Sequence, residues 1–176
     1  MQILLTILVA IAVLIALLLI YAATRPDAFR IERRARVNAP PERITPLVND
    51  FALWRQWSPW EGRDPNLKRT MSGAPSGVGA VYNWEGNNQV GQGRMEILES
   101  TPQRILIKLD FIKPFAASNM ADFTFTPADT ATDVNWAMTG TRPFMMKVMG
   151  VFMDMDKIVG KDFETGLASL KAQAES

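Results

Sequence analysis

The chain has 176 residues, no cysteine and no histidine, and its 19 Lys and Arg nearly balance its 18 Asp and Glu. These counts exclude disulfides, thiolate metal sites and histidine-based acid–base catalysis. A net charge of +1 also gives no electrostatic argument for nucleic-acid binding. We therefore expect no nucleic-acid partner, no metal and no cofactor. Any chemistry would depend on carboxylates, Lys, Tyr, Ser or bound water.

The first segment of the chain is almost entirely apolar. Residues 3–23 form one run in which Thr6 is the single mildly polar member, and residues 1–24 hold no charged side chain. At 1.5 Å per residue, such a helix extends about 31 Å and matches a hydrocarbon core of roughly 30 Å. The run predicts an uncleaved transmembrane anchor. A signal peptide is disfavoured because no Lys or Arg precedes the run and because the bulky Tyr21 stands where a small residue is required.

The charges next to the anchor predict its orientation. No positive side chain precedes the apolar run, whereas arginines follow it closely at positions 25, 30, 33, 34 and 36. By the positive-inside rule, we expect a single-pass protein of the cell membrane with its domain on the cytoplasmic side. The chain divides into an anchor (1–24), a linker (25–28) and one globular domain (29–176).

The domain begins with elements of both kinds. Residues 29–37 alternate imperfectly and are rich in charge, which predicts a first strand. Pro40 and Pro41 then open a short helix whose apolar side chains recur at helical spacing as far as Phe51. A second short helical piece is expected over 53–57, ending at a Ser-Pro step.

Beyond residue 67 the apolar periodicity changes to two. Short alternating runs follow one another about a dozen residues apart, each bounded by Gly, Pro, Asn or Asp. This pattern predicts an antiparallel meander of about six strands, because parallel strands would need longer crossover connections. From about 149 to 172, apolar residues recur at three and four, which predicts one long helix across the concave face of a curved sheet. The expected fold class is α+β.

The domain resembles the START/Bet v 1-like (SRPBCC) superfamily, in its polyketide cyclase/dehydrase-like branch. The resemblance is carried by motifs in the same order over most of the domain: WRQWSPW (54–60) with DPN (64–66), GVGAVYNWEGN (77–87) with GQG (91–93), TDVNW (132–136) and MDKIVGKDFETGL (155–167). It implies a helix-grip fold, in which a curved antiparallel sheet wraps a long C-terminal helix. It also implies an apolar cavity between them that holds lipids or other hydrophobic ligands.

Aromatic side chains on the inward face of the strands and in the short helical segment are the candidate ligand contacts, although each could equally fill a core. The segment 144–153, which holds four of the ten Met, is either the start of the long helix or a surface that gates the cavity or touches the bilayer. The candidate ligand-binding residues are Trp54, Trp57, Trp60, Tyr82, Trp84, Phe111, Phe123, Trp136, Met149, Phe152 and Met155.

A catalytic set does not emerge. Asp154 and Asp156 are two residues apart on the predicted helix and point to different sides, so they cannot hold one metal. Glu61 and Asp64 fit turn and cap positions, and the glycine pairs at 77–79 and 91–93 fit bulges or close packing rather than a phosphate loop.

Three functions stay open at this point. The first is membrane-anchored binding of a hydrophobic small molecule or lipid. The second is a polyketide cyclase/dehydrase-type enzyme, in which Tyr82 or a carboxylate moves a proton. The third is a ligand-free protein-interaction module.

Overall fold

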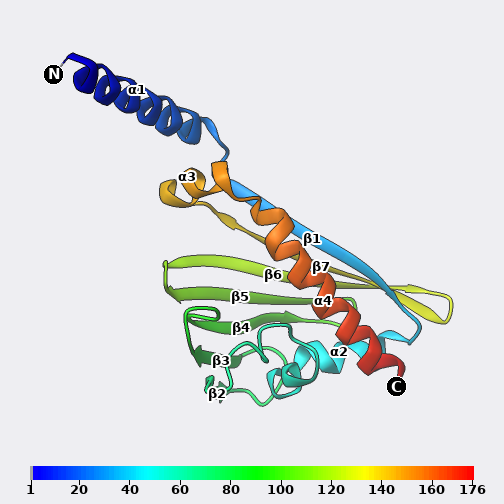
Figure 1. The fold of residues 1–176 in the computed structure, drawn as a ribbon. Helices are drawn as coiled ribbons and strands as arrows, with labels where there is room; N and C mark the ends of the chain where they lie inside the picture. Colours follow the sequence, from blue (N-terminus) through cyan, green and yellow to red (C-terminus); the bar gives the residue numbers. More distant parts are fainter. Residues whose placement is uncertain (1) are drawn as a thin grey trace.

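The computed structural model describes residues 2–176. It begins with helix α1 (Gln2–Thr24), which projects away from the rest of the chain (Figure 1). Nearly all of its side chains are exposed, and Ala22 is the one buried residue in it. Within the described residues, α1 is the one helix that is long and apolar enough to cross a membrane.

The domain is built on one sheet of seven antiparallel strands in the order β1-β7-β6-β5-β4-β3-β2. This sheet confirms the predicted meander, since β2 to β7 are neighbours in chain order, and β1 pairs with β7 at the edge. The strands are β1 (Ala28–Val37), β2 (Lys68–Gly73), β3 (Ala80–Glu85), β4 (Gln92–Ser100), β5 (Arg104–Lys113), β6 (Ala117–Ala128) and β7 (Ala131–Thr141).

Two irregularities in β4 bend the sheet. The pairing of β4 with β5 shifts at Gln92/Gly93 and again between Ile97 and Glu99. Such bulges increase local twist and curvature. At Gly93 the Trp84 ring lies 2.3 Å from where a Cβ would stand, so only glycine lets the indole lie against the strand. The close packing predicted for this glycine pair is confirmed.

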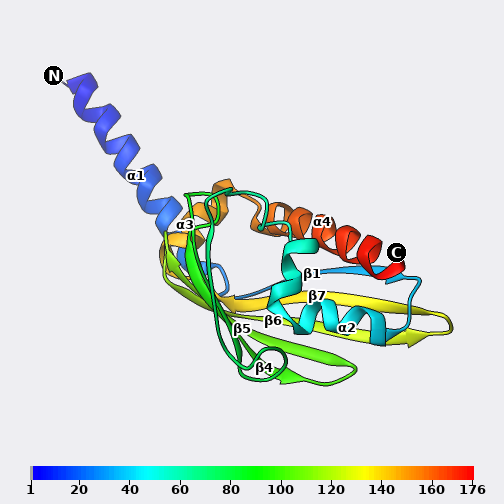
Figure 2. The same cartoon turned by 90° about the horizontal axis from the view of Figure 1, so that it is seen from below.

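The helices α2 (Pro41–Asn49) and α4 (Met155–Glu175) lie on one face of the curved sheet (Figures 1 and 2). The 3₁₀ helix η1 (Phe51–Gln56) follows α2 directly. Arg33 on β1 holds α4 in place, because its guanidinium donates to Asp156 Oδ2 at 3.0 Å and to Glu164 Oε1 at 2.8 Å. This arrangement is the predicted α+β helix-grip fold.

The predicted long C-terminal helix is confirmed as α4, but its predicted start near 149 was wrong. The structure has α3 (Phe144–Phe152), a break, and then α4. Met153 is extended at the break, and the Asp154 carboxylate accepts a hydrogen bond from the Lys157 N–H at 3.1 Å. Asp154 is therefore the N-cap of a new helix, a role that short acidic side chains favour.

An aromatic stack joins the sheet to α4. The Trp136 ring lies parallel to Phe163 of α4, with centroids 4.1 Å apart, and is also stacked on Phe123 at 4.8 Å. Trp54 of η1 and Trp57, the residue directly after η1, pack edge-on against Phe123. Their indole N–H groups donate to backbone carbonyls of α2, so both rings are fully satisfied within the core.

Gly166 allows α4 to approach this stack. A Cβ at this position would lie 2.8 Å from the Trp136 ring and 3.0 Å from Pro59. We expect Gly166→Ala to destabilise the domain by about 1–3 kcal/mol, since overpacking outweighs the gain in helix propensity of about 1 kcal/mol. The measurement is urea unfolding of the full chain in detergent micelles, monitored by tryptophan fluorescence.

Gly150 provides the matched control within α3. A Cβ at Gly150 would meet nothing within 4 Å, so Gly150→Ala is expected to be neutral or stabilising by up to about 1 kcal/mol. Equal effects of the two substitutions would contradict the close packing at Gly166.

Candidate functional site: two adjoining cavities

Two cavities lie between the inner face of the sheet and the helices. The inner cavity has a volume of about 270 Å³ and the outer cavity about 760 Å³. Phe111, Met138 and Val159 line both, so the two spaces adjoin. The outer cavity lies within the size range of sites that hold small molecules and cofactors, and the inner cavity lies just below it.

The inner cavity is walled mainly by aromatic and aliphatic side chains. Its floor is the inward face of β3 to β7, and its roof comes from the segment after η1 and from α4. Six of the predicted ligand-binding residues line it: Trp54, Trp60, Tyr82, Trp84, Phe111 and Trp136.

One charged cluster closes an edge of the inner cavity. The Glu61 carboxylate accepts a hydrogen bond from the Tyr82 hydroxyl at 2.6 Å and from Arg69 Nε at 2.6 Å. Only 8% of the Glu61 side chain is exposed. Glu61 lies in a turn, as the sequence suggested, but its side chain also joins Tyr82 and Arg69, which the sequence did not predict. Asp64 also fits a turn role, because it accepts hydrogen bonds from the backbone N–H groups of Asn66 and Asn87.

The cluster determines the protonation of Tyr82. Burial, followed by the hydrogen bond to the negative Glu61, raises the pKa of the Tyr82 phenol well above its ordinary value near 10. The phenol is therefore neutral and already donates its proton to Glu61. An acid–base catalyst works best with a pKa near the working pH, whereas the pKa of Tyr82 is shifted further above neutral pH.

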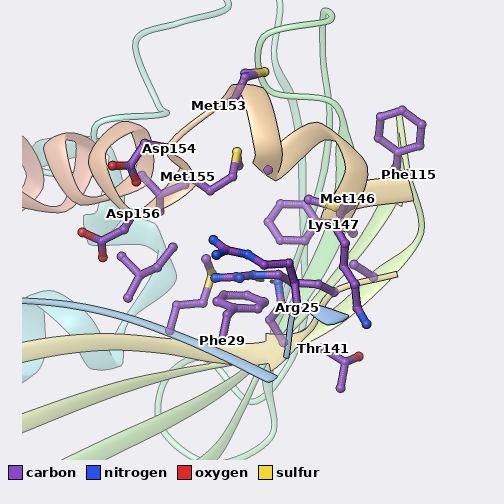
Figure 3. Close-up of a pocket in the computed structure, with 18 of the residues that line it drawn as sticks. Arg25, Phe29, Phe115, Thr141, Met146, Lys147, Met153, Asp154, Met155 and Asp156 are labelled. Carbon is purple, nitrogen blue, oxygen red and sulfur yellow. Dashed lines mark hydrogen bonds between the residues drawn. The ribbon is translucent and has the colours of Figure 1, made fainter. Parts of the chain in front are cut away.

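The outer cavity lies beneath α3 and the beginning of α4. Figure 3 shows Arg25 and Phe29 between the sheet and these helices. The Arg142 guanidinium stands over the Phe29 ring, 5.5 Å from its centroid. Two further predicted residues, Phe152 and Met155, line this cavity.

One residue in the lining of each cavity has a buried polar atom without a partner. Within residues 2–176, the buried side-chain polar atoms that make no hydrogen bond are Trp136 Nε1 and Asn119 Oδ1. Trp136 lines the inner cavity and Asn119 the outer one. Leaving such a group unpaired costs about 1–3 kcal/mol, so each side chain would gain free energy by turning this atom toward a partner in the cavity.

The remaining predicted contacts lie outside the two linings. Trp57 and Phe123 are buried in the core, 2% and 0% exposed, and Met149 is on α3. Sequence reasoning missed Asn119, Arg25 and Arg142. Asn119 had a usable signal, because it is a polar residue at an inward position of β6. No group of three or more Asp or Glu side chains in the described chain is placed to hold a metal ion.

Comparison with known families identifies the domain. Residues 28–175 match the family described as polyketide cyclase/dehydrase and lipid transport. No curated protein matches the sequence.

Solved structures share the fold at low sequence identity. Protein CV1439 from Chromobacterium violaceum is 18% identical, with a TM-score of 0.58, over 86% of this chain and 99% of that one. The Aha1 dimer from Colwellia psychrerythraea is 16% identical (TM-score 0.60) over 84% and 96%. The di-domain ARO/CYC StfQ of the steffimycin biosynthetic pathway is 12% identical (TM-score 0.61) over 85% of this chain and 51% of that one.

The raised pKa of Tyr82 predicts a loss of stability in alkali. A group whose pKa is higher in the folded state contributes its full stability below the unfolded pKa, and this contribution falls as the pH rises through the folded value. We therefore expect the wild type to be more stable than Tyr82→Phe below pH 10 and this difference to shrink above pH 10. Urea unfolding of both proteins between pH 8 and 11 measures it. A difference that does not change with pH would contradict the Tyr82–Glu61 hydrogen bond.

Proposed function

Because the chain belongs to the polyketide cyclase/dehydrase and lipid transport family, we propose that its two cavities bind one hydrophobic small molecule or lipid without covalent chemistry. The observation that carries this proposal is the pair of adjoining, largely apolar cavities, whose linings include the two residues that have an unpaired buried polar atom. Burial of apolar ligand surface would drive binding at about 25 cal/mol per Å². Part of that gain offsets the lost freedom of the ligand.

The two polar atoms indicate the chemistry of the ligand. Trp136 Nε1–H can donate to a carbonyl, hydroxyl or ester oxygen, and the Asn119 amide can both donate and accept. A pure hydrocarbon would leave both atoms unpaired. The proposed ligand is therefore an amphiphile with at least one oxygen along a largely apolar body.

The geometry of Tyr82 supports binding over cyclase or dehydrase chemistry. An enzyme of that type would use Tyr82 or Glu61 to move a proton in the inner cavity. Both Glu61 oxygens are already engaged, one by Tyr82 and one by Arg69, and the Tyr82 pKa moves away from neutrality. We infer that the cluster has a structural role, in which it stabilises the wall of the inner cavity.

The apolar helix α1 belongs to the same proposal. We place it as a single transmembrane anchor in the cell membrane, with the domain on the cytoplasmic side. The support is the length and composition of α1 and the arginines that follow it. An anchored domain would take its ligand from the adjacent bilayer.

Native mass spectrometry of the full chain, released from lipid nanodiscs or mild detergent, tests binding. We expect co-purifying apolar mass on the wild type and at least several-fold less on Ala121→Leu, because Ala121 lines the inner cavity. Thr124→Leu is the matched control, since Thr124 lies on the same strand and outside both cavity linings. A wild type without bound mass would overturn the proposal.

Trp136→Phe tests the polar contact separately. The substitution keeps an aromatic ring in the stack and removes the indole N–H. We expect the bound fraction to fall about 5- to 10-fold, which corresponds to a lost hydrogen bond of roughly 1–1.5 kcal/mol. Unchanged occupancy would show that the ligand leaves Trp136 Nε1 unpaired.

A further inference from the structure

The end of the domain nearest α1 carries an exposed apolar surface. We define this surface by α3 and the turn between β5 and β6. It lies beside the end of α1 in both views of the molecule, and α3 packs against α1 (Figures 1 and 2). The surface therefore sits where the anchor would leave the membrane.

This surface consists mainly of apolar side chains, although they are exposed to water. Helix α3 has no buried residue, although it is built almost entirely of Phe, Met, Val and Gly. The exposed fractions are 73% for Phe152, 60% for Met145, 52% for Phe115 and 49% for Phe144. Large apolar side chains clustered in this way mark contact with a partner or a membrane.

Three cations beside this surface lack a carboxylate partner in residues 2–176. Arg25, Lys113 and Arg142 line the outer cavity and form no salt bridge there. The nearby carboxylates are engaged, since Asp27 pairs with Lys147, Asp156 with Arg33, and Asp154 caps α4. Apolar side chains next to free cations match the boundary between acyl chains and lipid phosphates.

We propose that α3 and the β5–β6 turn insert into the surface of the anionic bilayer that α1 enters. This inference rests on the proposed anchoring by α1. Phe115 and Phe152 of this surface also line the outer cavity, as does Met153 directly after α3. Inserted in this way, they place the rim of the cavity among acyl chains, and a lipid reaches the cavity without crossing water.

The absence of cysteine makes the test direct, because each single-cysteine variant carries one label. The full chain with Met145→Cys or Phe152→Cys, labelled with an environment-sensitive fluorophore, is placed in phosphatidylcholine/phosphatidylglycerol nanodiscs containing acyl-chain nitroxide lipids. We expect nitroxide lipids to quench both labels several-fold more than a label at Val78→Cys. Val78 is the matched control, because it is 59% exposed and lies outside the proposed inserted surface. The residues on either side of it form backbone hydrogen bonds to Asn49 of α2 and to β4.

A label at Leu14→Cys, in the middle of α1, separates the two proposals. Quenching at position 14 together with positions 145 and 152 supports insertion. Quenching at position 14 alone, with 145 and 152 no more quenched than 78, overturns the inserted surface and leaves the anchor in place. No quenching at position 14 overturns the anchor and the insertion together. A blue shift at 152 without lipid quenching assigns the surface to a protein partner or a second copy and also overturns insertion.

Discussion

The stacking of Trp136 between Phe123 and Phe163 fixes the distance between the sheet and α4. The 4.1 Å separation from Phe163 is possible because Gly166 has no side chain at the point of contact. On one side of this stack, Trp54 of η1 and the following Trp57 fill the space. On the other side the pairing of β4 is irregular, and the inner cavity lies between the sheet and α4. Both the solid core and the cavities therefore depend on one aromatic contact.

The polar groups around the cavities fall into two classes with different consequences. Glu61, Arg69 and Tyr82 satisfy one another, so they hold the loop after η1 rigidly against β2 and β3. Trp136 Nε1 and Asn119 Oδ1 are buried and have no partner within residues 2–176. A satisfied network stabilises one shape, whereas an unpaired buried group gains free energy when it acquires a hydrogen-bond partner. The charged cluster therefore makes one cavity wall rigid, and the two unpaired groups are the ones that a bound ligand would stabilise.

The sequence predicted much of this fold because alternation and turn chemistry are local signals. The strands from Ala80 onward and the inward positions of Tyr82, Trp84, Phe111 and Trp136 follow from period-two patterns. The break between α3 and α4, just before Asp154, could not be predicted from the sequence. Apolar residues continue across it at helical spacing, and whether Asp154 caps a helix depends on the local backbone. Trp54 and Trp57 illustrate how far the residues of the candidate site can be predicted from the sequence. Trp54 lies in η1 and Trp57 directly after it, yet only Trp54 lines the cavity, and sequence periodicity does not distinguish an inward side chain that faces a void from one that fills the core.

The distribution of charge along the two cavities argues for one orientation of an amphiphilic ligand. The inner cavity contains the buried Glu61 carboxylate, and a second anion placed there would be repelled in a poorly solvated space. The outer cavity has Arg25, Lys113 and Arg142, which no carboxylate of the described chain neutralises. A ligand with an acidic head would therefore enter tail first and keep its head beneath α3. In that orientation the apolar tail would contact the aromatic wall and an oxygen partway along the ligand would lie near Trp136. In the proposed membrane-anchored protein, the head would stay at the level of the lipid phosphates. The inner cavity would then select the tail by its shape and the outer cavity the head by its charge.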